Sequence, residues 1–404
     1  MPRSASRQGH GLLVAGATAA ANVLAYALSV VASRRLGLEG FGQVASLLAV
    51  VLVASVPGQA LQAGIARRSA HHADRATDGS GEAVAGAAVG AAVFLVLLAL
   101  SPVLQAVLKL SALSAPAWAA VSVLPQTVCF ACLGLLQGHE RFRRLSVAVV
   151  LVQAARLAGG VGGVLIVNSP AGMLAGTTAG LAAAAVASCI LAGVTPWHAG
   201  TALRPALDGL VRNTSAVLSV VVLTNLDLLL ARNRLAGSAA GTYAAGALVA
   251  KMAFFAPSFA AVLLFPRLAR PADRGRALRT GAGVLAASAA LSVGGAVVGR
   301  AAVPLVLGGA YRPLESLVWL FAASGSALAA VHLLVQAGLA AGNHVLSALV
   351  WIAVALEVLV VVAVVHSVTA LVLVVLGLAI TLVVTGAFLE LRPASRRYVS
   401  VPVP

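Results

Sequence analysis

The sequence predicts an all-α polytopic membrane protein with about 12 transmembrane helices arranged as two parallel six-helix repeats. Hydrophobic residues make up 61% of the 404 residues and charged residues only 9%, whereas a soluble domain is about one-quarter charged. The apolar residues form runs of about 20, the length that an α-helix needs to cross a bilayer. The alternation typical of barrel strands is absent, so helices are expected to satisfy the backbone hydrogen bonds inside the lipid.

Twelve apolar segments are predicted to be the spans. Their expected ranges are 10–32, 41–66, 84–108, 116–137, 146–167, 171–193, 214–235, 241–266, 281–307, 315–339, 345–366 and 368–390. The connections between them are short, so no sizeable soluble domain is expected.

Basic residues indicate how these spans are oriented. Of the 27 lysines and arginines, 18 fall in segments on the side of the N-terminus, six on the opposite side and three inside spans. Cytoplasmic loops carry the excess of basic residues, so both termini are expected in the cytoplasm. The net charge of +16 is spread over short loops, and no nucleic-acid partner is expected.

Composition also indicates a compartment. Lysine occurs only at Lys109 and Lys251, and alanine, glycine and valine are abundant, as in proteins encoded by GC-rich bacterial genomes. We therefore expect a multi-pass protein of the bacterial cytoplasmic (inner) membrane, surrounded by membrane lipids.

The two halves of the chain show a weak internal repeat. Four landmarks recur at an offset of 199 or 200 residues, namely Leu36 and Leu235, Gly42 and Gly241, Pro57 and Pro257, and Arg67 and Arg267. Six spans in each half make both halves enter the membrane from the same side, which is a parallel repeat of the kind found in transporters. The predicted division is an N-terminal six-helix lobe at 1–193, a cytoplasmic linker at 194–213, and a C-terminal six-helix lobe with a short cytoplasmic tail at 214–404.

The landmark regions carry motifs that point to a family. After the first span the sequence reads LGLEGFG at 36–42, close to a loop L-G-P-E-E-F/Y-G. Span seven holds Asp227 among apolar residues, and G-T-Y at 241–243 opens span eight. A proline within span eight, Pro257, and P-R-L at 266–268 complete the pattern. In these motifs the chain resembles the polysaccharide transporters (Wzx-type flippases) of the multidrug/oligosaccharidyl-lipid/polysaccharide flippase superfamily.

The resemblance implies a flippase that moves or exports a lipid-linked oligosaccharide or polysaccharide precursor across the cytoplasmic membrane by alternating access. The lipid-linked glycan would then be the substrate, H⁺ or Na⁺ the candidate coupling ion, and polysaccharide polymerases or glycosyltransferases the candidate partners. Such a protein makes and breaks no bond, so no enzyme activity is expected.

Four ionisable residues of both signs fall near the middle of predicted spans: Arg156, Asp227, Lys251 and Glu357. A charge at mid-bilayer costs at least about 2.5–3.5 kcal/mol, so it persists mainly where it faces a partner or a water-filled cavity. Arg156 and Lys251 are candidates to bind the substrate phosphate, and Asp227 and Glu357 to bind a coupling cation or proton. Alternatively, Asp227 and Lys251 form an ion pair that holds two consecutive antiparallel helices in register.

Uncharged polar residues inside spans are further candidates for the cavity wall. They are Asn22, Gln59, Gln62, Gln153, His332 and Gln336. Their side chains could hydrogen-bond the hydroxyl groups of a sugar. The alternative is that they form hydrogen bonds between helices.

Prolines and small residues indicate where helices bend or approach closely. Pro57 and Pro257 occupy equivalent places in the two repeats and are hinge candidates for alternating access, although each is equally compatible with a static kink. The G-x-x-x-G pairs at 159–163 and 172–176 predict close helix packing.

The sequence contains no Walker lysine, no G-x-S-x-G, no H-E-x-x-H and no cluster of metal ligands. No catalytic residue, cofactor or metal is therefore expected. A cation-coupled multidrug or small-molecule antiporter of the same superfamily is the alternative function. A membrane glycosyltransferase or polymerase would need larger outer loops with acidic residues, and a non-transporting scaffold would not need charges in the membrane.

Overall fold

The computed structural model describes residues 2–71, 80–194, 210–268, 271–340, 343 and 345–391. These residues form helices and turns, without a strand among them. The elements are α1 (Pro2–Ala54), α2 (Val56–His71), α3 (Ser80–Val107), α4 (Ser114–Gly138), α5 (Phe142–Ile166), α6 (Pro170–Ala192), α8 (Leu210–Leu223), α9 (Leu226–Arg234), α10 (Gly237–Leu268), α11 (Pro271–Val298), η1 (Gly299–Ala301), α12 (Ala302–Leu307), η2 (Gly309–Leu314), α13 (Val318–Ala340), α14 (Val345–Val364) and α15 (Val368–Leu391).

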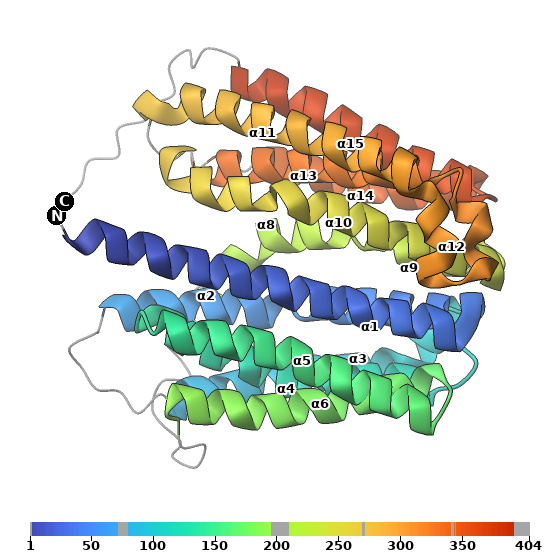
Figure 1. The fold of residues 1–404 in the computed structure, drawn as a ribbon, viewed down its shortest axis with the longest axis horizontal. Helices are drawn as coiled ribbons and strands as arrows, with labels where there is room; N and C mark the ends of the chain where they lie inside the picture. Colours follow the sequence, from blue (N-terminus) through green and yellow to red (C-terminus); the bar gives the residue numbers. More distant parts are fainter. Residues whose placement is uncertain are drawn as a thin grey trace.

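The helices form two groups that lie side by side (Figure 1). In the first bundle, α1–α6, helix α5 packs on α6 and α1, and α4 packs on α2, α3 and α6. In the second bundle, α8–α15, helix α10 packs on α11 and α13, and α13 packs on α15. Helix α1 contacts α9 and α10 across the two bundles. The lobe boundaries stay predictions, because most of the predicted linker, 195–209, lies outside the described residues.

The described helices confirm an all-α polytopic membrane fold. Nine of them are long and apolar enough to cross a bilayer. The first of these stretches, Leu13–Ala70, covers most of α1 and α2 and is 58 residues long, which at about 1.5 Å per residue is enough for two crossings. The number of twelve spans is therefore approximate, although each predicted span overlaps a described helix.

The predicted connection between the first two spans is a sharp kink inside α1, where two helices meet at Gly37. One residue in the helix, Gly37, has a non-helical conformation with φ 67° and ψ −170°. Glycine adopts a positive φ at little steric cost, so one residue is enough to end the first helix and start the second in a new direction. The second predicted span is then interrupted at Ser55, between α1 and α2.

The seventh span, predicted as one helix at 214–235, is also interrupted. Helix α8 ends at Leu223 and α9 begins at Leu226. The hydroxyl of Thr224 donates to the Val220 carbonyl at 2.9 Å, and the amide of Asn225 donates to the Val221 carbonyl at 2.8 Å. Side chains that bond back to the preceding turn compete with the helix ladder, which explains the break.

The predicted span at 281–307 contains a third interruption. Helix α11 ends at Val298, a short 3₁₀ turn follows, and α12 completes the span. Pro304 lies in α12 and lacks a backbone N–H, so it cannot donate the hydrogen bond that would join α12 to the preceding turn.

Helices α5 and α6 pack through small residues, as the glycine pairs predict. Side chains added at Gly159 and Gly163 would collide with the backbone of Gly176 and Gly172, respectively. Backbones that approach this closely leave no space for a Cβ, and such contacts are a principal way for helices to associate in lipid.

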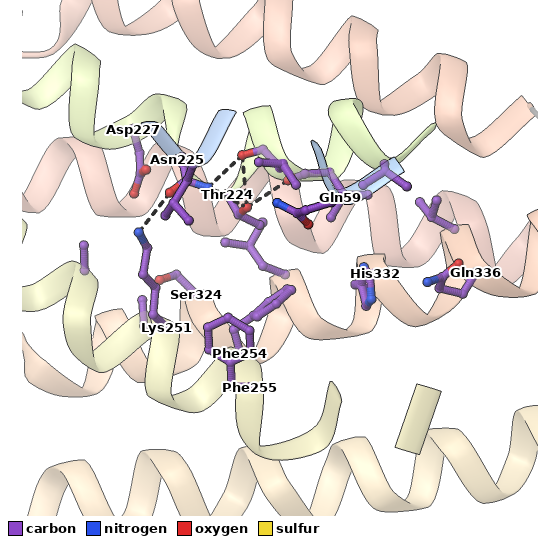
Figure 2. Close-up of a pocket in the computed structure, with 18 of the residues that line it drawn as sticks. Gln59, Thr224, Asn225, Asp227, Lys251, Phe254, Phe255, Ser324, His332 and Gln336 are labelled. Atoms are coloured by element: carbon purple, nitrogen blue, oxygen red, sulfur yellow. Dashed lines mark hydrogen bonds between the residues drawn. The ribbon is translucent and has the colours of Figure 1, made fainter. Parts of the chain in front are cut away.

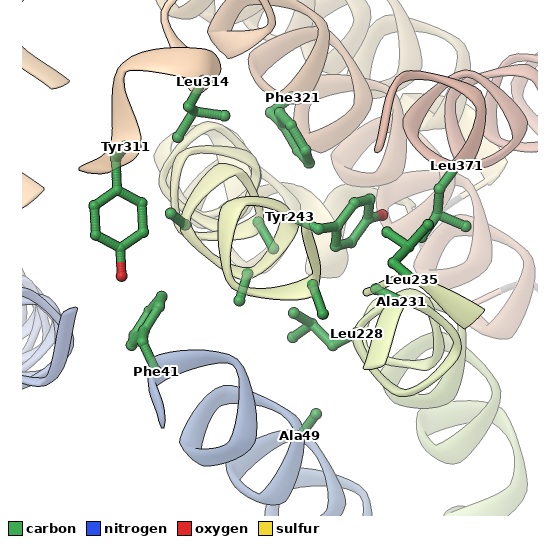
Figure 3. Packing of buried hydrophobic residues seen from close by; sticks show 14 of the residues in the cluster. Phe41, Ala49, Leu228, Ala231, Leu235, Tyr243, Tyr311, Leu314, Phe321 and Leu371 are labelled. Atoms are coloured by element: carbon green, nitrogen blue, oxygen red, sulfur yellow. The ribbon is translucent and has the colours of Figure 1, made fainter. Parts of the chain in front are cut away.

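The largest described core cluster joins the two bundles at one end (Figure 3). Phe41 from α1 meets Tyr311 from η2 with ring centroids 6.4 Å apart and nearly perpendicular. Tyr243 and Phe321, both in the second bundle, stack edge-to-face with centroids 5.2 Å apart. We call this end, where α3 and α12 finish, the gate end; the charge bias predicts that it faces the outside.

Candidate functional site

A cavity of about 340 Å³, which we call the first cavity, lies between α8, α10 and α13 and the α1–α2 junction (Figure 2). Its polar lining residues are Gln59, Thr224, Asn225, Asp227, Lys251, Ser324, His332 and Gln336. Aromatic and aliphatic side chains, among them Phe254 and Phe255, form the remaining wall. A mostly apolar wall with a few convergent polar groups is typical of a ligand site.

The break between α8 and α9 supplies the polar side of the first cavity. Lys251 on α10 points toward this break, and its Nζ donates to the Asn225 Oδ1 at 2.9 Å (Figure 2). Asn225 is buried and also donates to the Val221 carbonyl. A single amide therefore connects the ammonium group of α10 to the end of α8.

Asp227 lies two residues further on and is 8% exposed. Its Oδ2 accepts a hydrogen bond from the Tyr243 hydroxyl at 2.8 Å, and its Oδ1 accepts one from the Leu228 N–H at 2.9 Å. The Tyr243 hydroxyl therefore ties α10 to the first turn of α9.

The predicted ion pair between Asp227 and Lys251 is not formed in this structure. The two side chains line the same cavity, but Lys251 bonds to Asn225 and Asp227 bonds to Tyr243. The uncharged amide of Asn225 takes the place of the carboxylate because the helix break turns it toward Lys251.

A second cavity of about 220 Å³ lies between α1, α4 and α5 of the first bundle and α10. Asn22, Gln153, Arg156 and Lys251 line it, as do residues that were not predicted, chiefly Tyr26, Ser29 and Gln126. The Arg156 Nη1 donates to the Gln153 Oε1 at 3.4 Å. The two cationic side chains, one from each bundle, face the same space, and its described lining contains no carboxylate.

Several polar atoms at these cavities are buried without a hydrogen-bond partner. They are the Tyr26 hydroxyl, Gln126 Oε1 and Arg156 Nε at the second cavity, and His332 Nδ1 at the first. Leaving a buried polar group unsatisfied costs about 1–3 kcal/mol. Atoms in this state that line a cavity are suited to bind a polar ligand or water.

The two cavities share Leu52, Ala247, Lys251 and Phe255. Lys251 is the shared charged residue. The structure therefore brings seven of the eight predicted substrate residues to two adjoining cavities, with Lys251 between them.

The remaining predicted residues lie elsewhere. Gln62 lines neither cavity, and its Nε2 donates to the Gln137 Oε1 at 3.4 Å. Glu357 on α14 also lines neither; it is fully buried, and neither carboxylate oxygen has a hydrogen-bond partner. The four ionisable residues therefore do not form one cluster.

The hinge candidates occupy different settings. Pro57 lies in the first turn of α2, directly after the interruption at Ser55, and lines an apolar groove between the two bundles. Proline fits there because the first turn of a helix needs no N–H donors. Pro257 lies along α10, beyond the part of that helix whose side chains are described. Both stay predicted hinges.

Besides Tyr26, Ser29 and Gln126 of the second cavity and Ser324 of the first, three residues around Asp227 were missed from sequence. Thr224 and Asn225 sit side by side in an apolar run, directly before Leu226 and Asp227, and this polar pair was the available signal for a helix break. Tyr243 was noted only as part of a motif. Its role as the donor to Asp227 depends on the packing of α10 against α9.

The described residues hold no group of three or more histidine, cysteine, aspartate or glutamate side chains that could bind a metal ion. The fold and the two cavities define a helical membrane protein with a polar interior between two bundles.

Several solved structures share this fold, and transporters are among them. One is a multidrug resistance MATE family transporter of the MOP superfamily in an inward-facing conformation, with a TM-score of 0.72 and 11% identity over 92% of this chain and 94% of that chain. Another is the lipid II flippase MurJ in an inward closed conformation, with a TM-score of 0.72 and 11% identity over 93% and 87%. The eukaryotic MATE transporter AtDTX14 matches with a TM-score of 0.68 and 12% identity over 96% of both chains.

The chain belongs to the polysaccharide biosynthesis protein family, whose sequence pattern matches residues 10–272. A sequence search of curated proteins finds no match. The chain therefore combines membership of this family with the multi-pass helical fold of the MATE and MurJ structures.

Proposed function

We propose that this protein flips or exports a lipid-linked oligosaccharide or polysaccharide precursor across the bacterial cytoplasmic membrane by alternating access. The substrate would enter from the inner leaflet with its headgroup in the two cavities and its lipid tail in the bilayer. Its phosphate would lie near Arg156 and Lys251, and its sugars near the glutamine, asparagine and histidine side chains of the cavity walls.

The observation that carries the proposal is the charge of the second cavity. Arg156 and Lys251 line it from opposite bundles, and no carboxylate is among its described lining residues. A cationic pocket with low-dielectric walls attracts an anion and repels a cation. The Arg156 Nε and the Tyr26 hydroxyl are both buried there without partners, so they can donate to phosphate oxygens.

The first cavity suits the uncharged part of such a substrate. Gln59, Asn225, His332 and Gln336 supply amide and imidazole groups, and Phe254 and Phe255 supply flat apolar surfaces. Sugars present hydroxyl groups and apolar ring faces together, so a wall that mixes both kinds of side chain can bind them.

The carboxylates suit a coupling ion. Asp227 faces the first cavity with one bond from Tyr243, and Glu357 is buried with both oxygens unpartnered. A buried charge without a partner costs several kcal/mol. A bound H⁺ or Na⁺ would remove that cost, and its release would link the ion to movement of the bundles.

A cation-coupled multidrug antiporter is the second candidate. The MATE fold of two matched structures and the presence of Asp227 in the first cavity favour it. A cationic drug would have to bind beside Lys251, however, which is electrostatically unfavourable unless Asp227 outweighs it.

A proteoliposome assay separates the two functions. The probe is a fluorescent oligosaccharide linked through a phosphate to a short polyprenol, and its headgroup is quenched from one side. We expect Arg156→Met and Lys251→Met each to slow flipping at least about tenfold, because each removes a charge-assisted contact of roughly 1.5–3 kcal/mol. Gln62→Leu, which alters neither cavity, is the matched control. Transport of a lipophilic cationic dye without flipping of the probe would overturn the proposal.

A further inference from the structure

The two bundles contact each other at the gate end through hydrogen bonds from side chains of one bundle to helix-terminal carbonyls of the other. In the first bundle, α3 ends near Val107, Leu108 and Lys109; in the second, α12 ends near Leu305, Val306 and Leu307. The last carbonyls of a helix have no partner within the helix. They are therefore available to donors from the opposite bundle.

The second bundle caps the end of α3. Arg232, at the end of α9, is 3% exposed. Its Nε donates to the Leu108 carbonyl at 2.9 Å and its Nη2 to the Lys109 carbonyl at 2.9 Å. Asn233 donates from Nδ2 to the Val107 carbonyl at 2.8 Å. Glu39 of α1 adds an ion pair to Arg232 at 3.5 Å.

The first bundle caps the end of α12 in the same manner. Ser33 on α1 donates from its hydroxyl to the Leu307 carbonyl at 3.4 Å. Arg34 donates from Nε to the Val306 carbonyl at 2.7 Å, and from Nη2 to the Leu305 carbonyl. A positive side chain at a helix C-terminus is also favoured by the helix dipole.

These two sets of contacts are equivalent under the internal repeat. Arg232 lies 199 positions after Ser33, and the carbonyls that they reach, those of Leu108 and Leu307, are also 199 positions apart. Asn233 likewise lies 199 positions after Arg34, and the carbonyls that they reach, those of Val107 and Val306, are also 199 positions apart. The acceptors form two identical pairs, Val107 with Val306 and Leu108 with Leu307. The residues that follow, Lys109 and Gly308, both have a positive φ, as is common where a helix ends.

From this correspondence we infer that the ends of spans one and seven form a reciprocal gate, in which each caps the end of the third span of the opposite bundle. In parallel repeats related by a twofold axis, a contact from one bundle to the other is matched by its reverse. All the matched bonds must break before the bundles can separate at this end. The gate would be one step of the proposed alternating access. Its role in transport rests on the proposed function, whereas the contacts that hold it closed do not.

Tyr311 of η2 reinforces one side of this gate. Its hydroxyl lies 3.4 Å from the Ser33 carbonyl and 3.4 Å from the Gly37 carbonyl, at the kink of α1. Burial raises the pKa of Tyr311, so its hydroxyl keeps the proton that it donates.

The test measures access to the cavity behind the gate and needs no substrate. Ala45 lines the second cavity on α1, and Ala45→Cys is placed in a chain whose three native cysteines are replaced by alanine. A membrane-impermeant maleimide is added outside intact cells. We expect slow labelling in this parent and about tenfold faster labelling in Arg34→Ala and in Arg232→Ala, because each loses charge-assisted bonds.

Arg234→Ala is the matched control. Arg234 lies on the same helix end as Arg232, but its Nη2 donates to the Val362 carbonyl within the second bundle. Its removal is expected to leave the labelling rate unchanged. Equal rates in Arg34→Ala, Arg232→Ala and the parent, or fast labelling of the parent itself, would overturn the gate.

A second measurement, crosslinking across the gate, tests the proposal if the arginine variants fold poorly. The pair Val107→Cys with Asn233→Cys, and its repeat equivalent Val306→Cys with Arg34→Cys, are bridged by a short reducible bis-thiol crosslinker. Either bridge is expected to stop transport, and reduction is expected to restore it. Unchanged transport with both bridges in place would refute a gate at this position. If the flippase proposal fails because the glycan probe is not flipped, the labelling rates still report on the gate.

Discussion

Gly42 of α1 and Gly241 of α10 meet across the two bundles, and each holds the same position in its own repeat. A Cβ on Gly42 would lie 3.2 Å from the Gly241 nitrogen, and a Cβ on Gly241 would collide with the Leu38 carbonyl oxygen. Equivalent residues that contact each other lie close to the axis that relates two repeats. The gate contacts are therefore arranged around this pair of glycines.

The first prediction concerns this contact. Gly241→Ala is expected to push α10 away from Leu38 and open the gate end, with a cost of about 1–3 kcal/mol in the closed state, as for other overpacked sites. Labelling of Ala45→Cys from outside should accelerate, and thermal unfolding in detergent should occur at a lower temperature. Gly283→Ala on α11, where no atom lies near the added Cβ, is the control. Identical labelling of the two variants would contradict the prediction.

The second prediction concerns Lys251 and Asp227. The two side chains have separate partners, Asn225 and Tyr243, so their losses should not compensate. Lys251→Met and Asp227→Asn are each expected to reduce glycan flipping, and the double variant should be at least as impaired as the worse single one. Restored flipping in the double variant would show that the two form an ion pair during transport.

Much of the fold could be predicted from sequence because lipid imposes simple requirements. Runs of about 20 apolar residues specify spanning helices regardless of their packing, and the small residues of α5 and α6 predicted their close contact. The interruptions at Ser55 and at Thr224 and Asn225 were not predicted, since hydropathy does not report a side chain that bonds back to its own helix.

The site was predicted only in part, for a related reason. The cost of a charge in lipid singled out Arg156 and Lys251, and both line one cavity. Depth along a helix does not specify which face a residue occupies, so Gln62 was assigned to a cavity that it does not line. The reciprocal gate could not be predicted from the sequence. The repeat at an offset of 199 shows which positions are equivalent, but not which residues of the opposite bundle they contact.

The third prediction concerns the anchor of Asp227. Tyr243→Phe removes the hydroxyl that bonds to Oδ2 at 2.8 Å and leaves the Leu228 N–H as the bond to Oδ1. Loss of a hydrogen bond to a charged group typically costs about 1.5–3 kcal/mol. We expect a lower unfolding temperature and a change in the H⁺ or Na⁺ concentration that gives half-maximal transport. Thr381→Val on α15 removes a hydroxyl that donates to the Gly377 carbonyl, outside both cavities and the gate, and should leave that concentration unchanged. An equal shift of the half-maximal ion concentration in both variants would show that the shift comes from general destabilisation.

The last prediction concerns Glu357, whose two carboxylate oxygens are buried without hydrogen-bond partners. An unpaired charge at this place would cost several kcal/mol, so we expect the group to be neutral, by binding H⁺ or by pairing with Na⁺, in the closed-gate state. Glu357→Gln is neutral and nearly the same shape, so its thermal stability should stay within about 1 kcal/mol of the parent. Transport should lose its dependence on the coupling ion, measured as initial flipping rate with and without a gradient of H⁺ or of Na⁺. Glu315→Gln, in the connection before α13, is the control for loss of a carboxylate. Strong destabilisation of Glu357→Gln would mean that Glu357 is charged and held by a structural partner. Ion-dependent transport by Glu357→Gln at the parent rate would exclude Glu357 as the coupling residue.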